Sequence, residues 1–436
     1  MASHRPLRGF ALAPSLLFAG LLLSGCAGGP TRPTVPISTG DPRVDPIAEA
    51  ETTAPEPIDT PVVVVTEEDA LQGALTPPHM VGRDVTRAAV LLPFSHPNRT
   101  VQAEAQGLLA AIELALFEQG DTNFLIIPKD TGGTPFGATE AAMEAVSEGA
   151  DVFLGPLFSG SVQSVRDIAR QANAPVIAFS NDPDAAGTGA FLATLSVEEE
   201  VARVVQYARQ FGVETFAFLG PANGYGRRVE AALRTEAAAV GAAISVTQFY
   251  DPANEAPVEA AEVVAEVLKQ EIEFRPDRIA LMIPEDGSRL RGVAPLIPYF
   301  GVDFRRIRML GTSRWLQDPL ALREPTLNGA WFAAPPPEAI ETFRASYQQV
   351  YGREAPSLAP LGYDAASIAI VLQRARRGID ETGITDPDGF RGVNGLFRFA
   401  EDGTTERSLS VYEIDIREGA VLVERGPLTF DEDPVG

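Results

Sequence analysis

Short apolar runs alternate with longer amphipathic stretches along most of the chain. Eight runs of strand length lie at residues 88–94, 124–128, 151–156, 174–180, 215–221, 243–250, 278–284 and 307–313. Their length and composition predict buried strands. The stretches between them, such as VQAEAQGLLAAIELALFEQG and GATEAAMEAVSEGA, have helical periodicity and close near a glycine. Because strands that alternate with helices form parallel sheets covered on both faces, two groups of four runs predict two α/β lobes.

One predicted helix in the second group carries a capping signal. Ser196 is followed three residues later by Glu199, which is the spacing of a capping box. In this motif each of the two side chains bonds the backbone N–H of the other residue. We therefore predict a helix that starts at Val197 and ends before Gly212.

The N-terminus has the layout of an export signal. A basic start precedes an apolar run at residues 10–23, and small residues follow. This run is shorter than the roughly 20 apolar residues that cross a bilayer, and Pro14 interrupts it. We therefore expect residues 1–25 to be a cleaved signal peptide.

The motif LSGC at residues 23–26 resembles the bacterial lipobox and contains the only cysteine of the chain. The resemblance implies that the signal is cut before Cys26 and that Cys26 is then acylated. With Ala27 next, it also implies a lipid anchor in the outer membrane, with the protein facing the periplasm. One acyl chain anchors only marginally, so stable attachment needs the multiple acylation of this class. The alternative is an unmodified cysteine within an ordinary signal peptide.

Residues 26–82 have the composition of a tether. Between Ala27 and Met80 there are ten prolines and nine acidic residues, but only two arginines. Such a segment has too little apolar surface to offset chain entropy, so we predict that it is disordered. The apolar stretch at residues 61–65 is either a strand that docks elsewhere or an apolar patch within the tether.

Charge and histidine content narrow the function of the remaining domain, residues 83–430. The formal net charge of −24 argues against binding to nucleic acid, which requires clustered basic residues. His4 lies in the signal and His79 in the tether, so His96 is the only histidine of the predicted domain. A histidine zinc site is therefore not expected, and no glycine-rich phosphate-binding motif is present. We predict a non-enzymatic protein without a metal or cofactor.

Several motifs of the domain, in order, resemble the type I periplasmic-binding family in its branched-chain amino-acid-binding branch. They are LLPF, GPLFSGSVQSV, APVIAFS, GPANGYG, GYDAASIAI and GFRGVNGLFRFAEDG, spread over residues 84–425. The resemblance implies two Rossmann-like lobes, joined by three crossovers, that close over a ligand. It places the first lobe at about residues 84–195 and 332–385, and the second at about residues 196–331 and 386–430.

The resemblance also names candidate ligand-binding residues. Ligands of doubly wound sheets bind beyond the carboxyl ends of the strands. By the family pattern, Ser159 and Ser180 would face an amino-acid carboxylate and Tyr225 would cover the ligand. Glu285 or Asp286 would accept the ammonium group. The alternative roles are a helix cap for Ser159, packing within its own lobe for Tyr225, and a solvated turn for the two acids.

The loop after Ser180 departs from the family pattern. Asn181 and Asp182 stand where the family usually has a small residue and a hydroxyl. They bring negative charge close to the expected carboxylate site, which weakens the amino-acid interpretation.

Two functions fit these features. One is an amino-acid-binding lipoprotein, of the leucine, isoleucine or valine type, that serves an ABC transporter. The other is an outer-membrane-anchored activator of penicillin-binding proteins, which would regulate peptidoglycan synthesis through a class A penicillin-binding protein. We favour the activator, because a domain fixed to the outer membrane is poorly placed to serve an inner-membrane permease.

Overall fold

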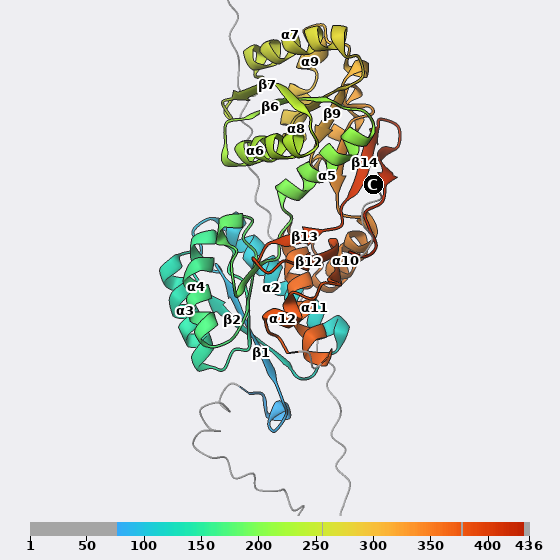
Figure 1. Cartoon of the computed structure of the whole chain (residues 1–436). Coiled ribbons are helices and arrows are strands. Elements are labelled where there is room, and N and C mark those ends of the chain that lie inside the picture. The colour runs from blue at the N-terminus through green and yellow to red at the C-terminus, as the bar shows by residue number, and fades with distance from the viewer. Residues whose placement is uncertain (1–75, 255, 376–377, 431–436) are drawn as a thin grey trace, which may run out of the picture. The chain divides into compact units, whose positions relative to one another are not determined.

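The computed structural model describes residues 76–254, 256–375 and 378–430 (Figure 1). All of them belong to one compact unit of the chain, which begins at Val65. The predicted signal peptide, Cys26 and most of the tether lie outside the described residues. None of the described helices is long and apolar enough to span a membrane.

The first lobe is built on a five-stranded parallel sheet in the order β2-β1-β3-β4-β5. Alternate residues of β1 point to opposite faces: Ala88, Val90 and Leu92 pack toward α2 and α11, whereas Ala89 and Leu91 pack toward α3 and α4. The early elements of this lobe are β1 (Thr86–Leu92), α2 (Arg99–Gln119), β2 (Phe124–Asp130), α3 (Pro135–Ser147), β3 (Val152–Leu154), α4 (Ser159–Gln171), β4 (Val176–Ala178) and β5 (Ala190–Leu192).

The second lobe contains a seven-stranded sheet in the order β15-β14-β10-β9-β8-β6-β7. Its five parallel strands, in the order β7-β6-β8-β9-β10, repeat the doubly wound order of the first lobe. Helices α5 and α6 cover one face of the sheet, and α7 and α9 cover the other. The elements are α5 (Val197–Gln210), β6 (Thr215–Pro221), α6 (Gly224–Ala239), β7 (Ala243–Tyr250), α7 (Val258–Phe274), β8 (Ile279–Met282), α8 (Gly287–Val293), α9 (Leu296–Tyr299), β9 (Arg308–Gly311) and β10 (Trp331–Ala334).

The C-terminal third of the chain contributes to both lobes. Helices α10 and α11 pack on α2, and Phe397 and Phe399 of β12 join the core of the first lobe. Strands β14 and β15 instead extend the sheet of the second lobe in antiparallel fashion. The remaining elements are α10 (Pro337–Tyr351), α11 (Ala359–Ala375), α12 (Glu381–Ile384), β11 (Phe390–Gly392), β12 (Gly395–Phe399), β13 (Thr405–Arg407), β14 (Ser410–Asp415) and β15 (Gly419–Glu424).

The predicted fold class is confirmed, with two corrections to the lobe boundaries. Strand β10 was assigned to the first lobe from Phe332 onward, but it pairs with β9 and β14 of the second. The segment at residues 386–430, assigned to the second lobe, is divided: β11, β12 and β13 form a small antiparallel sheet whose aromatic side chains fill the first core. Both assignments depend on strand pairing and on core contacts. These join residues that lie far apart in the sequence, so the local pattern does not predict them.

Two local predictions also differ from the structure. The helix at Val197 forms, but Ser196 makes no side-chain cap bond, and its hydroxyl donates to the Glu198 carboxylate at 2.7 Å. The last residues of the predicted tether are part of the fold, since Met80 is buried and Arg87 Nη2 donates to Thr76 Oγ1 at 2.9 Å. The ordered domain therefore begins before the expected residue 83.

A buried arginine lies where the chain crosses between the lobes. Arg407 Nε donates to the Thr194 carbonyl at 2.7 Å, and its backbone N–H donates to Glu199 at 2.6 Å. Its guanidinium carbon lies 4.4 Å from the centre of the Phe397 ring, over its face. Burial raises the pKa of Glu199 to about 7 and that of nearby Asp364 to about 6, while the positive charge of Arg407 acts to lower both.

Close packing of α2 on α11 gives the first prediction. A Cβ on Gly362 would lie 2.6 Å from the Leu108 carbonyl oxygen, so we expect Gly362→Ala to lower the free energy of unfolding by about 1–3 kcal/mol. Gly224, which opens α6, has no neighbour within 4 Å of its ideal Cβ, and Gly224→Ala should be tolerated. Urea unfolding measures both, and equal stability of the two variants would contradict this packing.

Candidate functional site

A cavity of about 470 Å³ is lined by residues of both lobes, at the carboxyl ends of the strands. The first lobe contributes the start of α2, the loops after β3 and β4, and the start of α11. The second lobe contributes the starts of α5 and α6 and the short helix η4 (Ser313–Gln317). This is where ligands of doubly wound sheets bind, and its volume suits a small molecule.

A larger hollow, of about 830 Å³, lies beside α10 and is lined by residues such as Arg344, Gln348 and Arg353. It is formed by one helix and the loop that follows it, away from the strand ends of either sheet. We therefore take the smaller cavity between the lobes as the candidate site, because two independently folded sheets converge on it.

The first lobe contributes an apolar wall to this cavity, together with polar residues that include Glu104 and Asn181. The wall consists of Leu157, Phe158, Phe179, Leu358 and Leu361. Phe179 and Leu361 belong to the buried core of the lobe, and Leu157 and Leu358 pack against that core. The wall is therefore the edge of the hydrophobic core of the first lobe.

The second lobe presents a polar wall, which consists of Glu200, Tyr225, Arg228, Ser313 and Arg314. The Tyr225 hydroxyl lies 2.8 Å from Thr312 Oγ1, and the Arg314 guanidinium stacks over the Tyr225 ring at 4.1 Å. Burial raises the pKa of Tyr225, so its hydroxyl stays protonated. The Tyr225 hydroxyl and the Arg314 guanidinium are therefore two groups of this wall that can donate hydrogen bonds.

Glu200 is held at the base of the polar wall. Its two carboxylate oxygens accept from the Ser313 hydroxyl and the Ser313 backbone N–H, both at 2.7 Å. Burial raises the pKa of Glu200 to about 7, although the Ser313 hydrogen bonds act in the opposite direction. The side chain therefore ties α5 to η4 and carries a partial charge at neutral pH.

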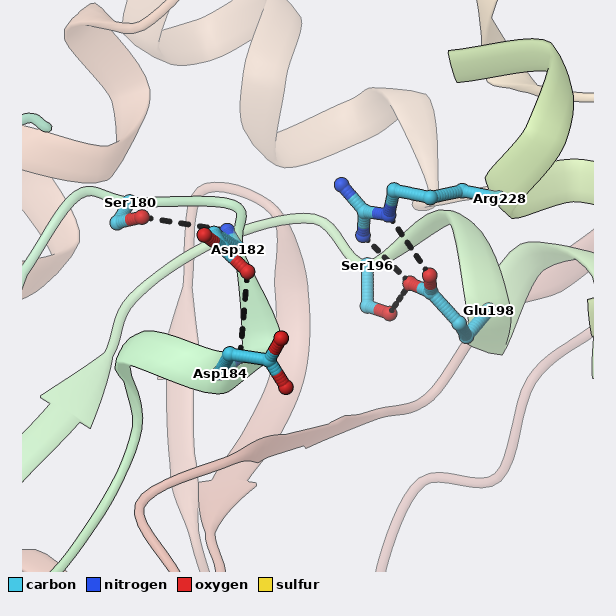
Figure 2. Close-up of polar contacts among 6 residues, drawn as sticks. All are labelled: Ser180, Asp182, Asp184, Ser196, Glu198 and Arg228. Carbon is cyan, nitrogen blue, oxygen red and sulfur yellow. Dashed lines mark hydrogen bonds and ion pairs between the residues drawn. The ribbon is translucent and has the colours of Figure 1, made fainter. Parts of the chain in front are cut away.

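Arg228 of α6 reaches across to the start of α5. Its Nε and Nη2 donate to the two oxygens of Glu198 at 2.9 and 2.7 Å, and Ser196 donates to the same carboxylate (Figure 2). These bonds hold the pKa of Glu198 below its ordinary value against the opposing effect of burial. The third guanidinium nitrogen of Arg228 points away from Glu198 (Figure 2).

The predicted carboxylate-binding serines do not line the cavity. Ser159 is half-buried in the first turn of α4, after Phe158 at the N-cap position. Ser180 is buried, and its hydroxyl accepts from the Asp182 N–H at 3.2 Å, while Asp182 in turn accepts from Asp184 (Figure 2). Asn181, which the sequence marked as a departure from the family, does line the cavity.

The predicted ammonium acceptors also have partners within the second lobe. Buried Glu285 accepts from the Tyr250 hydroxyl at 2.5 Å and does not line the cavity. Asp286 lies 3.3 Å from Arg314, so it borders the polar wall without lining it. Of the five predicted ligand residues, only Tyr225 lines the cavity.

Sequence reasoning missed Glu200, Arg228 and Arg314. Arg314 follows the predicted strand-end residue Ser313, so its neighbourhood could be found from the strand pattern. Glu200 belongs to a run of three glutamates that reads as an ordinary acidic first turn of a helix. Within the described chain, no group of histidine, cysteine and acidic side chains is arranged to hold a metal ion.

The raised pKa of Glu200 predicts how stability depends on pH. Because the folded chain binds this proton more tightly than the unfolded chain, the stabilisation present below pH 4.5 should be lost as pH rises to about 7. The loss should be at most about 3 kcal/mol. Glu200→Gln should remove this part of the pH profile in denaturant titrations, whereas Glu341→Gln, on the exposed side of α10, should not. A profile unchanged by Glu200→Gln would refute the assignment.

The chain was compared with known proteins. Residues 86–420 match the family model described as "Periplasmic binding protein". No curated protein matches the chain.

Three solved structures illustrate the similarity of fold. One is described as a branched-chain amino acid ABC transporter from Rhodospirillum rubrum, with 19% identity, a TM-score of 0.67, and coverage of 77% of this chain and 99% of that one. A leucine-binding protein from Thermotoga maritima has 18% identity, a TM-score of 0.51, and coverage of 79% and 99%. A solute-binding protein from Rhodopseudomonas palustris in complex with 3,4-dihydroxybenzoic acid has 18% identity, a TM-score of 0.53, and coverage of 80% and 98%. The two lobes, the doubly wound order of both sheets and the extent of the family match lead to one conclusion: this chain belongs to the periplasmic binding protein family.

Proposed function

We propose that this protein is a solute-binding protein that holds a small organic molecule between its lobes and delivers it to an ABC transporter. The observation that carries the proposal is the cavity of about 470 Å³ lined by both lobes at their strand ends. A ligand bound there contacts both walls, so its binding favours approach of the lobes.

The solved structures of similar fold support this choice. They include ABC transporter proteins for branched-chain amino acids and a solute-binding protein with a dihydroxybenzoic acid bound. The ligands of these proteins are small carboxylic acids, which is the broad class that we propose for this cavity. Binding without catalysis also fits the lining, since both oxygens of each lining glutamate, Glu104 and Glu200, already accept hydrogen bonds.

This proposal replaces activation of penicillin-binding proteins as the favoured function. The activator interpretation depended on an outer-membrane anchor at Cys26, which lies outside the described residues. The similar structures are transport proteins, and a cavity shared by both lobes gives a transport subunit a direct use for the fold. An amino acid of the leucine, isoleucine or valine type remains within the proposed ligand class.

A panel of ligands tests the proposal. We expect at least one of the twenty amino acids or a set of aliphatic and aromatic carboxylic acids to raise the melting temperature. A hundredfold excess over Kd adds about 2.7 kcal/mol of stability. Tyr225→Ala should reduce the shift, whereas Tyr299→Ala, on the exposed surface of α9, should preserve it.

Absence of a shift with every solute would contradict the proposed function. Retention of a class A penicillin-binding protein by the same purified protein would then favour the activator. Small-angle scattering with and without the active solute gives an independent measurement, since closure of the lobes should reduce the radius of gyration.

We also propose that Cys26 carries the lipid anchor, as the LSGC motif implies. Mass spectrometry of the mature protein should find an acylated Cys26 at its N-terminus, and Cys26→Ser should release the protein from membranes. Separation of inner and outer membranes should place the acylated form in the outer one. An unmodified N-terminus downstream of Cys26 would refute the anchor.

A further inference from the structure

The two walls of the cavity differ in chemistry, and this difference restricts the ligand. The apolar wall is continuous with the core of the first lobe, so it offers contact but few hydrogen bonds. The polar wall contributes Arg314 and Arg228 to the same cavity. A ligand that satisfies both walls has an apolar body and a polar head.

The arginines favour an anionic head. Arg314 pairs with Asp286 at 3.3 Å through one Nη, and its guanidinium carries further N–H donors. Stacking on Tyr225 at 4.1 Å fixes the plane of this guanidinium, which lowers the entropic cost of binding a carboxylate. Arg228 donates hydrogen bonds from Nε and Nη2 to Glu198, and its third guanidinium nitrogen points away from Glu198 (Figure 2).

The acids that line the cavity are poorly prepared to accept an ammonium group. Glu200 receives two hydrogen bonds from Ser313. Glu104 receives one from the Ser357 hydroxyl at 2.8 Å and one from the Leu358 N–H at 2.9 Å. Each of these four oxygens therefore has one donor already, and an amine in the cavity would have to share an acceptor that is already hydrogen-bonded.

Resting on the proposed function, we infer that the cavity selects small carboxylic acids that have an apolar body and lack an amino group. The carboxylate binds Arg314, and the body lies on the apolar wall beside Phe158 and Phe179. This assignment makes Arg314 the residue that determines the charge of the ligand. It differs from the α-amino acid geometry expected from Ser159, Ser180 and Glu285.

Matched ligands test the inference directly. Isocaproate and leucine share one carbon skeleton, and hydrocinnamate and phenylalanine share another, so each pair differs only in the amino group. Hydrocinnamamide has the same body as hydrocinnamate but no charge. Calorimetry on the purified protein should show each acid binding at least about tenfold more tightly than its amino acid, and hydrocinnamate at least about tenfold more tightly than its amide.

Arg314→Gln should lower the affinity for both acids by at least about tenfold and leave the affinity for hydrocinnamamide unchanged. Arg323 is an exposed arginine at the end of a short helix in the same lobe, so Arg323→Gln is the matched control. It should change neither the affinity for the acids nor that for the amide. The Arg314 ion pair is partly exposed, so the melting temperature of the free variant should stay close to that of the wild type. If it does not, the comparison of acid, amide and amino acid on the wild-type protein still decides the question.

Different outcomes separate the two proposals. Leucine or phenylalanine binding as tightly as its deaminated partner would overturn this inference and leave the proposed function standing. Equal affinity of wild type and Arg314→Gln for the acids would also overturn it. Failure of every solute in the wider panel to bind would overturn the proposed function as well.

Discussion

The buried charge of Arg407 is the constraint on which the geometry between the lobes depends. A guanidinium removed from water is costly unless opposite charges and hydrogen-bond acceptors surround it. Here the acceptor and the opposite charges come from two segments far apart in sequence. The Thr194 carbonyl and Glu199 lie at the first crossover and the start of α5, and Asp364 lies in α11. Loss of one partner of such a group costs about 3–5 kcal/mol, so these segments are held in a fixed relation.

The polar wall is positioned by contacts at the start of α5, next to the Arg407 site. Successive residues of a helix point about 100° apart, so three consecutive glutamates at the start of α5 cannot share one partner. Glu198 pairs with Arg228, Glu199 with the Arg407 backbone, and Glu200 with Ser313. The same helical turn therefore joins the crossover, α6 and η4. Both acids of the cavity lining, Glu104 and Glu200, therefore also hold structural elements together.

The sequence predicted the fold better than it predicted the site. Each of the eight apolar runs contains a strand, because burial on both faces of a parallel sheet requires continuous apolar residues. Strands β5 and β10 were not among the predicted runs. Among the site residues, Tyr225 was found from the family resemblance, in a loop that follows a predicted strand. Glu200 was not, because its burial depends on η4, which lies more than a hundred positions later. The capping prediction at Ser196 was wrong for a related reason. Glu198 pairs with Arg228, which lies later in the sequence, and the Ser196 hydroxyl donates to the same carboxylate and makes no cap bond.

The first lobe is built from segments that lie far apart in the sequence, and this affects how the chain folds during synthesis. Its parallel sheet is complete at Leu192, but α11, which covers one face of that sheet, begins only at Ala359, and Phe397 and Phe399 follow later still. The parallel core of the second lobe lies between these segments and needs none of them. During synthesis the second lobe can therefore bury its central strands while the first still exposes an apolar sheet face to other chains. A nascent chain that stalls before α11 is a target for chaperones and aggregation, and it also lacks Leu358 and Leu361, so the ligand cavity stays incomplete until the start of α11 has been made.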